Sequence, residues 1–296
     1  MSALARAQDG VTIFLGVIIE AAPFLLLGVL VSQALALLLS GDRVVRWLPR
    51  HRVGSLAAMA GLGALFPVCE CGNVPVARRL VTRGVPAAAA MVFLLSAPAL
   101  NPVVALSTFA AFRERPSVVL YRLGLTFVVA MSVGLLLTWH PRPADLLRRR
   151  APSDDHQHAA PAARFRSFAR GTLVEFTEMG SVLVVGAGLA ALTQTLVPRA
   201  ALLGVGQGPV VSVAVMMALA VMLSICSTVD AFVALAYAGT FTDGSLMAFL
   251  VFGPMIDIKS LLLMLTVFSA KTVGLVAVVV TELVFLLGLV LNYWMG

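Results

Sequence analysis

The sequence is short of charged residues and of cysteine. Charged side chains make up 12% of its 296 residues, about half of the share that a soluble domain uses to cover its surface. Apolar residues make up 60%, and the mean hydropathy is +1.00. Three cysteines are too few for a disulfide scaffold. The shortage of charge excludes a soluble protein and predicts an integral membrane protein.

Other absences narrow the class of membrane protein. The apolar runs do not alternate with polar residues and exceed the roughly 10 residues of a barrel strand, which excludes a β-barrel. The first run is too long for a signal-peptide core, carries Glu20 and Pro23 and ends in no small-residue cleavage site, so we expect a retained helix. No ATP-binding motif is present, so a transporter would be driven by an ion gradient or a partner.

Six long apolar runs can each cross a bilayer as a helix, which takes about 20 residues. Two more apolar stretches, 54–80 and 209–238, are interrupted in the middle by polar residues. The sequence therefore predicts an all-α integral membrane protein. The six runs are Val11–Ser40, Val85–Ala111, Ser117–Trp139, Thr172–Val197, Ser245–Ala270 and Thr272–Trp294.

An internal repeat relates the two halves of the chain. Cys-Gly-Asn-Val at 71–74 recurs as Cys-Ser-Thr-Val at 226–229, and similar residues recur upstream and downstream in the same order. A polar segment rich in Arg, Pro and Ala separates the halves. The other recurring pairs are Glu20 with Glu178, Gly28 with Gly186, and Pro98 with Pro254. We expect a first membrane repeat at 1–140, a polar cytoplasmic linker at 141–170 and a second membrane repeat at 171–296.

The positions of the arginines distinguish two topologies. With eight full spans, the Arg-rich loop 41–53 and the linker would lie on opposite sides, against the positive-inside bias. If 54–83 is instead a re-entrant hairpin, each half crosses three times and these arginines share the cytoplasmic side. We therefore favour two inverted halves, each with three spans and a broken re-entrant hairpin, and an outside amino terminus. The opposite side then keeps Arg6, Arg113, Arg115, Arg122 and Arg199.

This distribution also explains the net charge of +7. The basic residues cluster in short loops between apolar runs, which is typical of a multi-pass protein of the plasma membrane. We therefore expect no nucleic-acid partner.

Each interrupted stretch breaks at a tip that contains cysteine. Thiolates bind soft metals and thiophilic metalloids, and carboxylates could add oxygen ligands or take up protons. The tips are therefore one candidate for a shared substrate site near the midplane, in which Cys69, Cys71 and Cys226 could hold zinc or another soft metal. The other interpretation is that cysteine is a small residue that buries well. The candidate residues are Cys69, Glu70, Cys71 and Asn73 in the first tip, and Cys226, Thr228 and Asp230 in the second.

Ionisable residues inside the apolar runs form a second group of candidates. Such residues cost about 2.5–3.5 kcal/mol at a helix centre and face the protein interior. Asp257 and Lys259 form either a buried ion pair, with Asp230, or part of the substrate site, and Asn101 occupies the matching place in the first half. For Glu20 and Glu178 we favour a structural or proton-coupling role.

Long motifs in both halves resemble a known family. Phe-Pro-Val-Cys-Glu-Cys-Gly-Asn-Val-Pro-Val-Ala at 66–77 and Phe-Leu-Leu-Ser-Ala-Pro-Ala-Leu-Asn-Pro at 93–102 resemble the bacterial predicted-permease family that includes ArsP and the YraQ and YcgR proteins. The sequences at 226–234 and 249–259 resemble it equally well. The resemblance covers nearly the whole chain apart from the linker.

The resemblance implies an inner-membrane permease and not an enzyme. ArsP-like members export trivalent organoarsenicals, and cysteines of this motif are implicated there. YcgR-like members are paired with a small membrane-anchored partner protein and are linked to zinc limitation. Where many members carry Cys-Ser-Cys, this chain has Cys69-Glu70-Cys71, and the added carboxylate favours a cation.

We therefore expect a secondary transporter of a thiophilic metal ion or metalloid, such as zinc or an organoarsenical. The alternatives are a membrane subunit that holds a metal for a partner protein, and a membrane thiol-redox protein. The expected partners are the lipid bilayer and a small membrane-anchored protein. The sequence leaves open whether the chain also forms a homo-oligomer. No cofactor is expected beyond a bound zinc or other soft metal.

Overall fold

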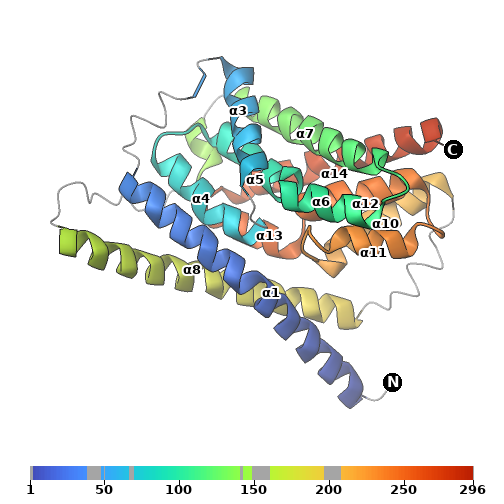
Figure 1. Ribbon diagram of the computed structural model, residues 1–296, viewed down its shortest axis with the longest axis horizontal. Helices are drawn as coiled ribbons and strands as arrows, with labels where there is room; N and C mark the ends of the chain where they lie inside the picture. Colours follow the sequence, from blue (N-terminus) through green and yellow to red (C-terminus); the bar gives the residue numbers. More distant parts are fainter. Residues whose placement is uncertain are drawn as a thin grey trace.

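The computed structural model describes residues 3–38, 48–49, 51–66, 70–140, 143–148, 161–196 and 208–295. Helices make up nearly all of the regular structure in these ranges (Figure 1). The first half contains α1 (Ala3–Leu38), α3 (Arg52–Leu65), α4 (Glu70–Thr82), α5 (Ala87–Leu100), α6 (Pro102–Ala111) and α7 (Ser117–Thr138). After the 3-10 helix η1 (Pro143–Leu146), the second half contains α8 (Pro161–Leu196), α10 (Pro209–Leu223), α11 (Asp230–Tyr237), α12 (Asp243–Met255), α13 (Ile258–Met264) and α14 (Ala270–Met295).

Within the described ranges, six helical segments are long and apolar enough to cross a membrane. Two further apolar helices, α3 and α10, have 14 and 15 residues. At 1.5 Å per residue they are about 21–23 Å long, short of the ~30 Å hydrocarbon core. An all-helical protein with six candidate spans and two shorter apolar helices is therefore confirmed. The six segments are Gln8–Leu35, Ala87–Ala111, Ser117–Thr138, Phe168–Thr195, Asp243–Met264 and Ala270–Trp294.

Two of the six segments are broken at matching places. The second consists of α5 and α6, which meet at Asn101, and the fifth consists of α12 and α13, which meet at Asp257. Each break follows a proline inside the preceding helix, Pro98 and Pro254. Proline removes a backbone donor and clashes with the previous turn.

The two residues at the breaks cap the helices that follow. The side chain of Asn101 accepts a hydrogen bond from the backbone N–H of Val104 at 2.9 Å, and that of Asp257 accepts one from Ser260 at 2.6 Å. A side chain that caps a helix start satisfies one of its orphan N–H groups. The breaks are therefore capped turns that join the two helices of each of these spans.

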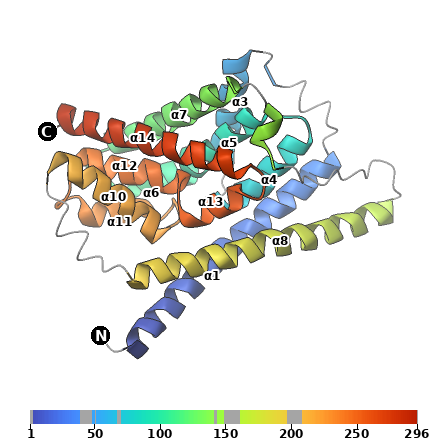
Figure 2. The ribbon, with the colours of Figure 1, turned by 180° about the vertical axis from the view of Figure 1, so that it is seen from behind.

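The packing of the helices largely repeats between the halves. α3 packs on α5 as α10 packs on α12, and α5 packs on α7 as α12 packs on α14. Across the halves, α4 packs on α13 as α11 packs on α6, while α5 contacts α12 and α7 contacts α14. The main exception is the pair α1 and α8, which pack on each other and on α4 and α13. Both views show this pair along one side of the bundle (Figures 1 and 2).

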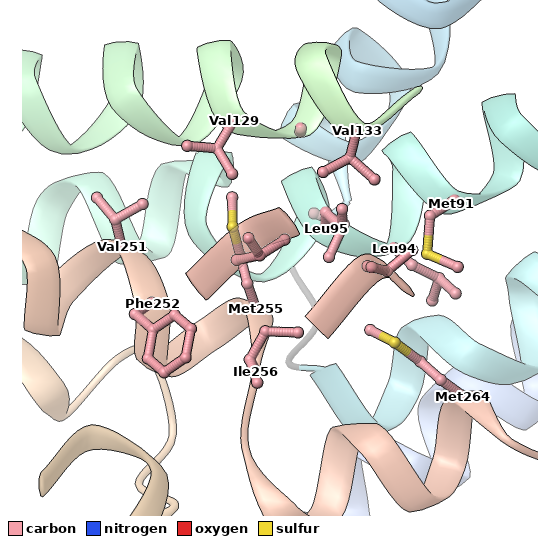
Figure 3. Packing of buried hydrophobic residues seen from close by; sticks show 14 of the residues in the cluster. Met91, Leu94, Leu95, Val129, Val133, Val251, Phe252, Met255, Ile256 and Met264 are labelled. Carbon is pink, nitrogen blue, oxygen red and sulfur yellow. The ribbon is translucent and has the colours of Figure 1, made fainter. Parts of the chain in front are cut away.

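The centre of the bundle is an apolar core between α5, α7 and α12. All residues of α5 from Ala87 to Ala99 are buried. Figure 3 shows side chains from α5, α7 and α12 meeting in this core. Large apolar side chains on the outward faces of α1 and α7 are exposed instead, such as Ile19 at 72% and Leu120 at 74%. Exposed apolar surface of this kind suits contact with hydrocarbon, where backbone groups must be satisfied within helices.

Candidate functional site

A buried cluster of charged residues lies where the start of α4 meets the start of α13. Lys259 Nζ is 3.4 Å from Glu70 Oε1 and 3.6 Å from Asp257 Oδ2. The three residues are between 1% and 5% exposed. Together with Cys71 and Asn73 in the first turn of α4, these residues form what we call the lysine cluster.

Local helix chemistry explains part of this arrangement. Asp257 and Ser260 form a reciprocal capping box that fixes the start of α13. Glu70 stands in the first turn of α4, where a negative charge interacts favourably with the helix dipole. A lysine in the first turn of α13 is unfavourable by itself for the same reason. The two carboxylates around Lys259 therefore stabilise a charge that the helix alone would not.

Polar atoms of the lysine cluster are left without partners. In the part of the chain that the structure describes, Glu70 Oε2 and both amide atoms of Asn73 are buried and make no hydrogen bond. Leaving a buried polar group unsatisfied costs about 1–3 kcal/mol, and more when it is charged. Such groups call for an explanation, such as a ligand, an ion or a water molecule.

Both cysteines within the described ranges are buried, Cys71 as a member of this cluster and Cys226 close to Lys259. Cys71 belongs to the first turn of α4, and Cys226 lies between α10 and α11. Both thiols lie close enough to the Lys259 ammonium for it to attract a thiolate at either position. The hydroxyl of Thr228, which is half-buried, lies 3.6 Å from Cys226 Sγ. Side chains from both halves of the chain therefore surround the ammonium.

The predicted three-cysteine metal site is not settled by these positions. Cys69 lies outside the described residues. Among the described side chains, no group of three or more His, Cys, Asp and Glu is close enough to hold a metal ion. The metal site therefore stays a prediction that depends on Cys69.

Glycines bring α1 and α8 directly onto the lysine cluster. A Cβ atom at Gly28 of α1 would overlap the backbone of Gly72, between Cys71 and Asn73. A Cβ atom at Gly186 of α8 would lie 3.2 Å from Cα of Lys259. Glycine permits such close approach because it has no side chain. The two glycines that the repeat relates therefore both cover this cluster.

A second buried cluster lies where α7, α6 and α11 meet. Asp230, at the start of α11, accepts hydrogen bonds from Arg122 Nη1 at 2.9 Å and Nη2 at 2.6 Å. Arg122 also donates to Thr108 Oγ1 at 2.8 Å and to the carbonyl of Ser227 at 3.3 Å. We call these four residues the arginine cluster. It shows that Asp230 pairs with Arg122 and not with Asp257 and Lys259.

The expectation that Arg122 belongs to the charges at one membrane surface is wrong. Its side chain is fully buried. It lies inside the candidate span Ser117–Thr138, and an arginine there is a signal for a buried partner. Within the described ranges, Arg122 Nε and the hydroxyls of Thr126 and Ser227 are also buried without a hydrogen bond.

The remaining predicted residues lie apart from the lysine cluster. Asn101 is buried, donates to the carbonyl of Ala97 at 3.0 Å and caps α6. Glu178 forms an ion pair of 2.8 Å with Arg78 and its side chain is 47% exposed. Glu20 is half-buried and has no ion-pair or hydrogen-bond partner among the residues described.

A buried carboxylate that sequence reasoning missed joins α1, α8 and α4. Glu175 of α8 accepts a hydrogen bond from Gln33 at 2.7 Å and from Ser32 at 3.2 Å, and Arg79 lies 3.7 Å away. Glu175 is one helical turn before Glu178, inside a predicted span. An ionisable residue inside a predicted span was the signal that could have identified it. It has no counterpart among the recurring residues, so the repeat did not identify it.

Comparisons with known proteins agree with this architecture. Residues 7–293 match the family described as "Predicted permease" (ArsP_1). The chain belongs to this family. It is 41% identical over 274 residues to the UPF0718 protein YcgR of Bacillus subtilis, which covers 92% of this chain and 93% of that protein. No solved structure matches the chain.

A second relative carries a more specific name. Over 261 residues the chain is 36% identical to a Streptococcus mutans protein named "Putative two-component membrane permease complex subunit". The match covers 88% of this chain and 87% of that protein. The predicted resemblance is therefore confirmed, and the chain is a multi-pass membrane permease, which implies a transporter and not an enzyme.

Proposed function

We propose that this permease is a secondary transporter of a thiophilic metal ion or metalloid and that the lysine cluster binds the substrate. The observation that carries the proposal is the buried polar surface of Glu70 and Asn73, which lacks hydrogen-bond partners among the described residues. A substrate that satisfied these atoms would recover about 1–3 kcal/mol for each. This gives the cluster a physical reason to bind.

The groups around Lys259 have the ligand chemistry that a soft cation or an arsenical needs, although the described residues do not bring three of them together at metal-binding distance. Glu70 Oε2 and the amide oxygen of Asn73 offer oxygen, while Cys71 and Cys226 offer sulfur. Thiolate ligands favour soft metals, and oxygen ligands add affinity for a positive charge. Glu70 and Asp257 outnumber the single ammonium, so the ionised cluster has an excess of negative charge. Cys69 would supply a third thiol.

We further propose that the halves are inverted and that α3–α4 and α10–α11 are re-entrant hairpins. In support, α1 and α8 run in opposite directions, and α7 and α14 do so as well (Figure 1). The end of α1 and the start of α8 lie at the same end of the bundle (Figure 1). A common side for the loop after α1 and for the linker before α8 is what the positive-inside bias favours. We assign that side to the cytoplasm.

Transport in membrane vesicles tests the substrate and the site together. Zinc and methylarsenite would be measured by elemental mass spectrometry in right-side-out and inside-out vesicles that contain the full chain. We expect transport of at least one of them, lost in Glu70→Gln, Cys71→Ser and Cys226→Ser at unchanged membrane abundance. Asp243→Asn is the matched control. Asp243 forms an exposed ion pair of 3.0 Å with Arg115, and neither residue belongs to the lysine cluster. Wild-type vesicles that move neither substrate would contradict the proposal.

A second proposal is that the chain works with a partner protein. It is favoured by the name of the Streptococcus mutans relative, which describes a subunit of a two-component complex. We infer a second protein on this ground, and the small membrane-anchored protein that the family resemblance implies is the candidate. Reconstitution of the purified chain in liposomes, with and without the proteins that co-purify from its own membranes, tests it. Full transport by the chain alone would exclude an obligatory partner.

A further inference from the structure

The α1/α8 pair does not follow the matching packing of the two halves, because it lies on one half-to-half contact and not on the corresponding one. The pair packs on α4 and α13 and covers the lysine cluster. The counterparts of α4 and α13 are α11 and α6, which pack on each other in the same way. Across the described parts of the chain, neither α1 nor α8 makes a comparable contact with α6 or α11. Among the described residues, the α1/α8 pair therefore covers one of the two related faces and leaves the other uncovered.

The bare surface is apolar, and we call it the α6/α11 face. Its large side chains are between 43% and 68% exposed. Figure 1 shows α6 and α11 side by side, away from the crossing of α1 and α8. The side chains that define this face are Val103, Leu106, Phe109, Phe232 and Leu235.

We propose that the α6/α11 face is a second docking surface for the α1/α8 pair of the same chain. Exchange of the halves turns α1 into α8 and leaves the pair unchanged, while it turns the α4/α13 face into the α6/α11 face. The same sequence relation that allows the observed packing therefore allows packing on the other face. Movement of the pair between the two faces would cover the lysine cluster in the observed position and uncover it in the second. This inference rests on the proposed inverted halves.

The repeat specifies which residues meet in the second position. The offset between halves is 158 residues for Gly28 and Gly186, and 156 for Asn101 and Asp257. These offsets convert each contact of α8 with α13, or with the residues just after α13, into one between α1 and α6. Gly186–Leu262 becomes Gly28–Leu106, and Met179–Thr266 becomes Ala21–Ala110.

These converted contacts are sterically reasonable. Leu106 is exposed, as Leu262 would be without α8, and Gly28 has no side chain to clash with it. Ala21 and Ala110 are small enough for two helices to approach closely, as helices do in membranes. Lipid tails are as apolar as these helix faces, so leaving one face for the other has little hydrophobic cost. Packing and polar contacts then decide the balance between the two positions.

Polar contacts favour the position seen in the structure. Arg78 of α4 pairs with Glu178 of α8 at 2.8 Å, and Arg79 lies 3.7 Å from Glu175. The cysteines of the two tips are 155 residues apart. That offset places uncharged residues of α11, Val233 and Ala234, where α4 carries these two arginines. Loss of the arginines should therefore shift the pair toward the α6/α11 face.

Cysteine cross-linking in membranes tests the two positions. The background carries Cys69→Ser, Cys71→Ser and Cys226→Ser in the full chain. The pair Met179→Cys with Thr266→Cys reports the observed position, where the Thr266 hydroxyl and the Met179 sulfur are 3.5 Å apart. The pair Ala21→Cys with Ala110→Cys reports the second position. We expect both pairs to cross-link within one chain, and Arg78→Ala with Arg79→Ala to raise the second yield and lower the first.

The outcomes separate this inference from the proposed function. Cross-linking of the first pair shows that the protein is folded. If the second pair then never links, even without the arginines, the inference is overturned. It is also overturned if the second pair links only two different chains, because the α6/α11 face would then bind another copy. Neither result depends on substrate, so failed transport of zinc and methylarsenite with successful cross-linking would reject the substrate assignment alone.

Discussion

The lysine cluster and the arginine cluster connect the two halves of the chain by the same device. In each, the acid that starts a short helix of one half pairs with a base from the other half. Glu70 of α4 pairs with Lys259 of α13, and Asp230 of α11 pairs with Arg122 of α7. The two ion pairs differ in length. Lys259 lies 3.4 Å from Glu70, whereas Arg122 lies 2.6 Å from Asp230.

The chemistry of the two bases explains this difference. The planar guanidinium of Arg122 matches both oxygens of Asp230 at once, and its remaining Nη hydrogens reach Thr108 and the Ser227 carbonyl. The ammonium of Lys259 is a point charge shared between Glu70 and Asp257. We infer that the arginine cluster holds the halves together, whereas the lysine cluster keeps groups available for exchange with a substrate.

Removal of the arginine should have the largest effect on stability. Arg122→Met leaves the buried carboxylate of Asp230 without its partner, and breaking a buried pair in this way costs about 3–5 kcal/mol. We expect a large fall in the melting temperature of the purified protein in detergent. Arg122→Met combined with Asp230→Leu should recover most of it, because no buried charge remains. A single variant as stable as the wild type would refute the holding role.

Removal of the lysine should have a smaller effect that a cation can reverse. Lys259→Met leaves Glu70 and Asp257 without a cation, but one of two adjacent carboxyl groups can take up a proton. We therefore expect a loss of about 1–3 kcal/mol in the free energy of unfolding. The carboxylates of Glu70 and Asp257 then face each other without a cation, so added zinc should raise the melting temperature of this variant. Zinc should not rescue Arg122→Met. Equal rescue of both variants would remove the distinction between the clusters.

Replacement of Asn73 should separate stability from transport. Asn73→Leu removes two buried polar atoms that have no hydrogen-bond partner in the described part of the chain. We expect the melting temperature to equal or exceed that of the wild type, because no satisfied hydrogen bond is lost. The free energy of unfolding should rise by up to about 1–3 kcal/mol. Transport should fall strongly in the same vesicles. A marked loss of stability would show that this amide serves the fold and not the substrate.

The six spans could be predicted because their causes are local, whereas the breaks inside two of them were not predicted, although a proline precedes each. Length and apolar composition define the six segments, and prolines at Pro98 and Pro254 precede the two breaks. The repeat also related Asn101 to Asp257, which both cap the helix that follows. Glu70, Asp257 and Lys259 were selected because ionisable residues inside membrane segments face the protein. Their presence in one buried cluster agrees with that reasoning.

The pairing of charges could not be predicted, because it depends on how distant helices pack. Sequence reasoning assigned Arg122 to a membrane surface, although it lies in the second turn of α7 and reaches Asp230 across 108 residues. Glu175 was missed because it lacks a repeat counterpart and finds its partners on α1 and α4. The covering of only one face by α1 and α8 was also invisible, since two similar halves predict two similar faces.

The smallest effect is expected at Glu178, outside both clusters. Its side chain is 47% exposed, and its ion pair with Arg78 is 2.8 Å long. Exposed pairs contribute about 0–1 kcal/mol and are screened by salt. Glu178→Gln should therefore change the melting temperature little, and less at high salt, and leave zinc and methylarsenite transport unchanged. Loss of transport driven by a proton gradient, with substrate exchange preserved, would instead assign Glu178 the proton-coupling role and place a second functional site on α8.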